Sequence, residues 1–101
     1  MENIDVLVLL DVGGLEDKPK FEKHIKKEGF SIVEGESFAY SATSTTTTFA
    51  TKAYILEVFK KGLQKSGFSD ANLIFLLNET PYPPYYYDKN TNEFEQIKEE
   101  K

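Results

Sequence analysis

Two short apolar runs stand out in the pattern of hydrophobic and polar positions along the chain. Residues 4–12 read Ile-Asp-Val-Leu-Val-Leu-Leu-Asp-Val and are closed by Gly13-Gly14, and residues 71–77 read Ala-Asn-Leu-Ile-Phe-Leu-Leu. Each run is too short to cross a bilayer as a helix. Runs of this length that are rich in Val and Leu and bounded by turn residues are typical of strands buried on both faces. We therefore predict two central strands, at 4–11 and 71–77.

A first helix is predicted between these runs. Asp17 suits a helix N-cap and Pro19 suits a first helical turn, while Phe21 and Ile25 fall on one side at helical spacing. Gly29 supplies the residue at which such a helix ends.

A second helix is predicted over about residues 49–66, with Gly67 as its end. Its apolar residues follow one another at steps of three and four, and two more widen the stripe: Phe49, Ala53, Leu56, Phe59 and Leu63, with Ile55 and Val58. The low-complexity run before it, residues 43–48, has two interpretations. Its β-branched residues could extend the preceding strand, and its hydroxyls could equally satisfy the free amides of the helix start.

A short repeat relates the two helices. Gly29-Phe30-Ser31 and Gly67-Phe68-Ser69 each lead from a predicted helix into a predicted strand. Between the helices, residues 30–34 and 36–43 predict a pair of strands separated by Gly35, with Phe38 and Tyr40 on one face. Two such units form the pattern βαββαβ. We therefore predict an α/β (α+β) sandwich of the ferredoxin-like type over residues 1–79, with both helices on one face of the sheet.

The tail, residues 80–101, has a different composition. A proline-rich connector, residues 78–84, is followed by two short strand-like segments that flank the turn Lys89-Asn90-Thr91-Asn92. This pattern predicts a hairpin. Because a two-stranded ribbon is marginal alone, the hairpin must belong to the same single domain or to a dimer interface.

Composition and charge narrow the classes of function. The chain has no cysteine, which excludes disulfides and thiolate metal sites. No basic stretch precedes the first apolar run, so we expect a cytoplasmic protein without membrane association. The formal net charge is −5 and every basic residue is lysine. Because arginine is the usual bidentate ligand of phosphate and guanine, its absence disfavours a nucleic-acid partner. The lysines of the first helix form a patch that could still contact a nucleic acid, although a solvated helix face is the favoured interpretation: Lys18, Lys20, Lys23, Lys26 and Lys27.

The order of these signals resembles the Cas2/VapD-like group of small ferredoxin-like nucleases. The matching residues are Leu10-Asp11-Val12, Gly29-Phe30 and Ser37-Phe38, and the resemblance covers roughly residues 4–78. It implies a homodimer in which the aspartate that ends the first strand, here Asp11, comes from each protomer to hold a divalent metal near a phosphodiester. Mg²⁺ takes carboxylate oxygens and water. The resemblance therefore implies Asp11 as the catalytic and metal-binding residue and Mg²⁺ as the cofactor. A strand-end aspartate that caps the turn at Gly13 is the alternative interpretation.

A sheet with helices on one face leaves its other face to be covered. We expect a two-fold homodimer in which residues 82–97 cross to the partner. The expected interface residues are aromatic: Phe38, Tyr40, Tyr82, Tyr85, Tyr86, Tyr87 and Phe94.

Two functions follow as hypotheses. The first is a metal-dependent endonuclease that cleaves RNA or DNA at Asp11. The second is a non-enzymatic homodimeric interaction module, whose acidic charge suits a basic protein partner.

Overall fold

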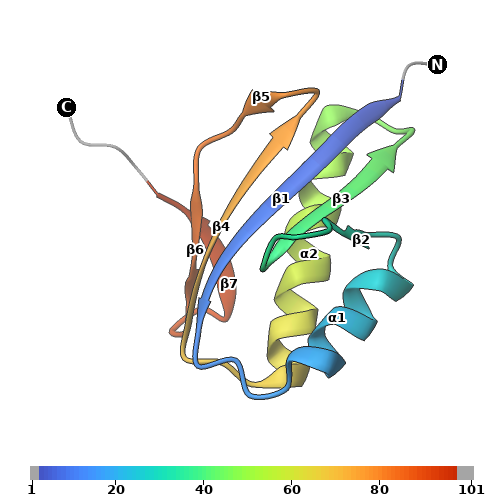
Figure 1. The fold of residues 1–101 in the computed structure, drawn as a ribbon. Coiled ribbons are helices and arrows are strands. Elements are labelled where there is room, and N and C mark those ends of the chain that lie inside the picture. Colours follow the sequence, from blue (N-terminus) through green and yellow to red (C-terminus); the bar gives the residue numbers. More distant parts are fainter. Residues whose placement is uncertain (1–2, 98–101) are drawn as a thin grey trace.

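The protein is a single antiparallel sheet with two helices on one face (Figure 1). The computed structural model describes residues 3–97. The described strands are β1 (Ile4–Gly13), β2 (Ser31–Ile32), β3 (Ala39–Ser44), β4 (Asp70–Leu77), β5 (Thr80–Pro81), β6 (Tyr85–Asp88) and β7 (Glu93–Gln96). The helices are α1 (Lys18–Lys27) and α2 (Thr48–Ser66). The strand order is β2-β3-β1-β4-β6-β7, and β5 pairs with β4. The predicted mixed α/β class is confirmed.

The helix boundaries follow from local capping. The Asp17 side chain accepts a hydrogen bond from the Lys20 amide at 3.0 Å, and Thr47 accepts one from the Ala50 amide at 3.1 Å. Gly29 and Gly67 both have positive φ, at 102° and 81°, which L side chains rarely adopt. Both predicted helices and both predicted stops are thus confirmed. Residues 43–48 fit both interpretations of the low-complexity run, because the first of them end β3 and Thr47 caps α2.

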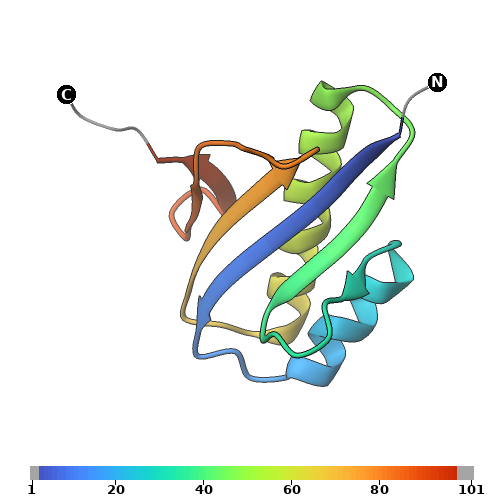
Figure 2. The same ribbon diagram turned by 45° about the horizontal axis from the view of Figure 1, so that its top comes forward.

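The two central strands are buried on one face only, which corrects the prediction of burial on both. In β1, Val6, Val8 and Leu10 are buried against the helices, whereas Leu9 is 40% exposed. The same alternation holds in β4, where Ile74 is 40% exposed. The strands are nevertheless central, since β1 pairs with both β3 and β4. The helices cover one side of the sheet, as the turned view shows (Figure 2).

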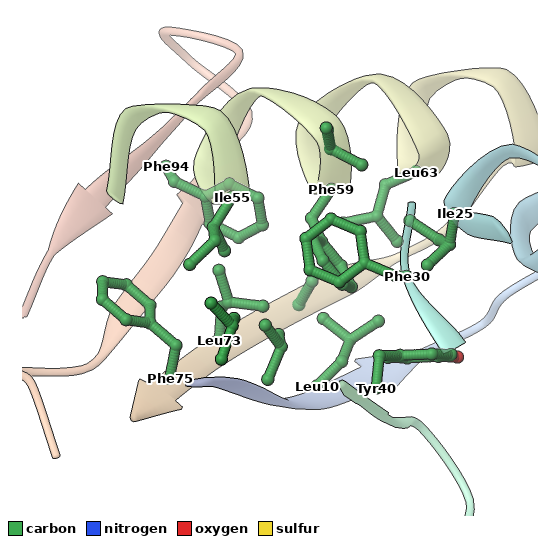
Figure 3. Close-up of a cluster of buried hydrophobic side chains, with 14 of the residues drawn as sticks. Leu10, Ile25, Phe30, Tyr40, Ile55, Phe59, Leu63, Leu73, Phe75 and Phe94 are labelled. Carbon is green, nitrogen blue, oxygen red and sulfur yellow. The ribbon is translucent and has the colours of Figure 1, made fainter. Parts of the chain in front are cut away.

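Aromatic side chains form the centre of the core between the sheet and the helices (Figure 3). Phe59 of α2 lies 5.2 Å from the ring of Phe30, 5.6 Å from Tyr40 and 6.0 Å from Phe21, measured between ring centroids. The pairs with Phe30 and Phe21 are edge to face, a geometry that adds stability beyond the area buried. The Tyr40 hydroxyl donates a 3.1 Å hydrogen bond to the half-buried Glu22 carboxylate.

The buried face of α2 differs from the predicted stripe. Phe49 is 82% exposed and Ala53 is exposed, while Thr51, Gly62 and Ser66 face the core. The reason is close helix packing at Gly62. A Cβ atom there would lie 3.1 Å from ring carbons of Phe21, a tight contact that would require the ring or the helix to shift. The small residues of α2 therefore mark its inner face.

The strand pair between the helices is shorter than predicted. β2 contains only Ser31–Ile32, and β3 begins at Ala39. The cause is a bend, because Phe38 has a φ of 60° and leaves the extended conformation. Phe38 and Tyr40, predicted on one face, both pack on the core of their own chain. Tyr40 is fully buried in the core, and half-buried Phe38 lies under the Lys18 ammonium, 4.7 Å from the ring centroid.

The predicted C-terminal hairpin is present and extends the sheet of its own chain. Tyr85 pairs with Leu73 and Tyr86 with Asn72, and β7 follows β6. The turn is closed by Asp88, whose carboxylate accepts from the Asn90 amide at 2.8 Å. The hairpin twists away from the plane of the central strands (Figure 2). Within residues 3–97, neither helix combines the length and apolar character that a membrane crossing requires.

Candidate functional site

The side of the sheet that faces away from both helices is called here the open face. Pairing register places on it the odd-numbered residues of β1 and the even-numbered residues of β4, together with Tyr86 of β6. Its principal members are Asp5, Leu7, Leu9, Asp11, Asp70, Asn72, Ile74, Leu76 and Tyr86.

Four aliphatic side chains occupy the centre of the open face. Leu7 is directly opposite Leu76, and Leu9 is directly opposite Ile74. Such cross-strand neighbours contact one another on a sheet surface. Leu9 and Ile74 are each 40% exposed, and Tyr86 is 39% exposed. The four aliphatic residues thus form one contiguous apolar patch on the two most central strands, where soluble proteins usually place polar residues.

Carboxylates lie at both ends of this patch. Asp5 precedes it on β1, and Asp11 follows it, with Asp70 of β4 two residue pairs beyond Asp11. The seven described strands contain six acidic residues and no lysine. Nine lysines lie on the two helices instead, on the other side of the sheet. The helices are thus the basic part of the described chain, and the carboxylates of the central strands on the open face are Asp5, Asp11 and Asp70.

Asp11 is exposed, and Asn72 lies directly opposite it on the open face. The Asp70 carboxylate lies directly beside Gly13, so that a Cβ atom at Gly13 would collide with it. Asp11, Asn72 and Asp70 offer oxygen donors, the kind that Mg²⁺ prefers. These residues fit Mg²⁺ in donor type. Across residues 3–97, no group of three or more His, Asp or Glu side chains is arranged to hold a metal ion.

Most of the aromatic side chains predicted at an interface pack against other residues of their own chain. Tyr87 and Phe94 are buried, and their rings meet edge to face at 5.4 Å. Tyr82 and Tyr85 are half-buried and stack on Phe75 at 5.5 and 5.9 Å. Of the predicted set, Tyr86 is the one residue placed on the open face.

The aliphatic members of the open face were not among the predicted site residues. The signal that could have found them is the alternation Asp5-Leu7-Leu9-Asp11, in which every second position reads acid, apolar, apolar, acid. Because side chains alternate between the faces of a strand, this pattern describes one face of β1. The alternation is hard to see in the sequence because the buried residues between these positions are also apolar, so the whole strand reads as one apolar run.

A cavity of about 440 Å³ lies at the start of α2, beside the end of β3. Val6, Phe30 and Ile55 form its apolar part, and Thr and Ser hydroxyls of residues 43–46 line its rim. The Tyr54 hydroxyl donates to the Glu28 carbonyl at 2.7 Å and lies 3.0 Å from its carboxylate. Burial, and then the Glu28 carboxylate, raise the pKa of Tyr54. This arrangement joins the end of α1 to α2.

His24 belongs to α1, and its ring faces α2. Its Nδ1 is 3.5 Å from Lys65 Nζ, and its Nε2 is buried without a hydrogen-bond partner within the described chain. Burial, and then the charge of Lys65, lower the pKa of His24 below its usual 6.5. His24 belongs to the helical layer, whereas Asp11 lies on the open face.

Comparisons of the chain with protein-family models, with curated proteins and with solved structures find no match to it.

Proposed function

We propose that this chain is a protein-interaction module of ferredoxin-like fold that binds its partner through the open face. The observation that carries the proposal is the apolar patch of Leu7, Leu9, Ile74 and Leu76 on the two central strands. Contiguous apolar surface of this kind marks interaction sites in soluble proteins. A central position on a rigid sheet also holds the side chains in place for binding.

The strand order supports the ferredoxin-like assignment. The first four strands lie in the order β2-β3-β1-β4, all neighbours are antiparallel, and both helices cover one face. This is the arrangement expected of a βαββαβ chain whose two halves each contribute a strand–helix–strand unit. The hairpin β6–β7 is then an addition at the β4 edge.

Site-specific photo-crosslinking in cells tests the proposed surface. A photo-reactive phenylalanine analogue in place of Ile74 reports on the open face, and the same analogue in place of Phe49 is the matched control on α2. Both positions are exposed and apolar. We expect discrete adducts at 74 and none at 49. Adducts at 49 alone, or none at either position under conditions where the chain is abundant, would contradict the proposal. An adduct between two copies of this chain would identify the homodimer expected from the sequence.

A Mg²⁺-dependent endonuclease of the Cas2/VapD-like type is the second candidate function. It is favoured by the exposed Asp11 at the end of a central strand, with Asn72 and Asp70 on the same face. A divalent metal held there would stabilise charge on a phosphodiester oxygen. Asp11 would be a ligand, and Asn72 and Asp70 would orient water or substrate beside it. Two-fold pairing of open faces would bring a second Asp11 to complete the set.

Cleavage assays decide this candidate. Purified protein is incubated with single- and double-stranded RNA and DNA in Mg²⁺, in Mn²⁺ or in excess chelator. The candidate requires cleavage that needs the metal and disappears in Asp11→Asn, a change that keeps the side-chain size and removes the charge. Glu34→Gln, an exposed acid in the loop between β2 and β3, should keep full activity. Cleavage by Asp11→Asn equal to that of the parent chain would remove Asp11 from the site.

A further inference from the structure

The distribution of charge around the apolar patch restricts what can bind it. The patch has Asp5 at one end and Asp11 with Asp70 at the other, and the described strands offer no cation to neutralise them. The ion pairs found within residues 3–97 join Lys60 and Lys61 to Glu57 and Glu93, away from these aspartates. The open face therefore presents aliphatic side chains between two uncompensated acidic ends.

A second copy of the chain is a poor fit to such a surface. If two open faces stack with β1 strands parallel, Asp11 of each copy approaches the other copy's Asp11. If they stack with β1 strands antiparallel, Asp11 approaches Asp5. Either arrangement places carboxylates opposite carboxylates at both ends of the apolar contact. Like charges brought together at an interface are strongly unfavourable.

The dimensions of the patch fit a helix. Asp5 and Asp11 are six residues apart on one extended strand, which corresponds to about 20 Å. The patch is two strands wide, and with side chains this is roughly 10 Å, close to the diameter of an α-helix. A helix spans about 20 Å in roughly 13 residues. On the other face of the same sheet, α2 already packs an apolar stripe against β1 and β4.

We propose, resting on the function proposed above, that the open face binds a basic amphipathic helix of a partner protein. The apolar stripe of that helix lies across Leu7, Leu9, Ile74 and Leu76. Its lysine or arginine side chains meet Asp5 at one end and Asp11 and Asp70 at the other. Charge complementarity selects this occupant over a second copy of the chain.

The test uses two synthetic helical peptides of about 14 residues, long enough to span the patch. Both carry leucine on one face, and the polar face is lysine in one peptide and glutamate in the other. Binding to the full-length chain is measured by fluorescence anisotropy over a range of salt concentrations. We expect saturable binding of the leucine–lysine peptide at one peptide per chain, weakened by salt, and no binding of the leucine–glutamate peptide.

Matched variants distinguish the effect of carboxylates at the patch from the effect of the chain's net charge on peptide binding. The pair Asp5→Asn with Asp11→Asn and the pair Glu34→Gln with Glu36→Gln remove the same total charge, but only the first pair lies at the patch. Loss of two exposed charge pairs should weaken peptide binding roughly two- to thirty-fold. The second pair should leave it unchanged. Equal weakening in both pairs, or equal binding of both peptides, would overturn the proposal.

A last variant distinguishes the failure of this inference from the failure of the proposed function. Leu9→Ser with Ile74→Ser, checked for folding by circular dichroism, should abolish peptide binding. If the parent chain instead sediments as a dimer that this variant dissociates, and the leucine–lysine peptide does not compete, the basic helix is wrong and the open face remains a binding surface. If the variant changes neither peptide binding nor sedimentation, the open face itself is wrong.

Discussion

Tyr87 holds the C-terminal hairpin against the body of its own chain, so truncating it measures that packing. The Tyr87 ring meets Phe68 edge to face at 4.8 Å and Phe94 at 5.4 Å, and only 8% of the residue is exposed. Its hydroxyl accepts a 2.8 Å hydrogen bond from Gln64 Nε2. Cutting a buried aromatic side chain to alanine costs roughly 3–5 kcal/mol. Because a domain of this size is stable by roughly 5–15 kcal/mol, Tyr87→Ala should lose a large part of the total.

Tyr87→Phe is the matched control, since it keeps the ring and removes only the hydroxyl. Because the hydrogen bond to Gln64 is only partly buried, its loss should cost about 0.5–1.5 kcal/mol. Urea unfolding followed by circular dichroism gives both free energies of unfolding. Repeating the parent measurement across about a hundredfold range of protein concentration should leave the midpoint unchanged, because the packing lies within one chain.

Two outcomes would refute this reasoning. If Tyr87→Ala costs no more than Tyr87→Phe, the hairpin is not docked on Phe68 and α2. If the midpoint rises with protein concentration and Tyr87→Ala removes that rise, the hairpin packs on a partner, as the sequence predicts for residues 82–97.

Three further predictions concern the helical layer. Gly62→Ala should lower the free energy of unfolding, measured by urea titration, by up to about 2 kcal/mol. Overpacking against Phe21 costs about 1–3 kcal/mol, and the better helix propensity of alanine offsets only about 1 kcal/mol of that cost. Net stabilisation would disprove the close contact. Thr47→Ala removes the N-cap of α2 and should lower the free energy of unfolding by about 1 kcal/mol. Thr45→Ala, the control, should leave it almost unchanged in the same titration. Because the pKa of His24 is lowered in the folded chain, the unfolded chain takes up the proton first. Stability should therefore fall as pH drops below about 6.5, and His24→Gln should flatten that part of the profile; an unchanged profile would remove His24 as its source.

Much of the fold could be predicted because its signals are local. Asp17, Gly29 and Gly67 act through their own backbone and side-chain geometry, so the helix ends needed no knowledge of the rest of the chain. The central strands were also predictable, since their apolar content demands burial of at least one face. The hairpin followed from its turn residues.

The remainder depends on packing between distant segments. A run such as Val6–Leu10 has the same composition whether one face or both are covered, and only the placement of the helices decides which. The inner face of α2 depends on Gly62 meeting Phe21 across the helix pair, a contact that periodicity does not encode. The aromatic residues of the tail were predicted to pack against a partner, whereas Tyr82 and Tyr87 contact Phe75 and Phe68 of the same chain.

The two edges of the sheet have a consequence for how the protein behaves when crowded. A free strand edge is a template on which another chain can add a strand and begin aggregation. One edge here is β2, only two residues long, and the other is β7, which carries Glu93 and Glu95. Two copies that met along β7 would bring these carboxylates together. The short β2 strand and the acidic β7 strand thereby oppose growth of the sheet from chain to chain.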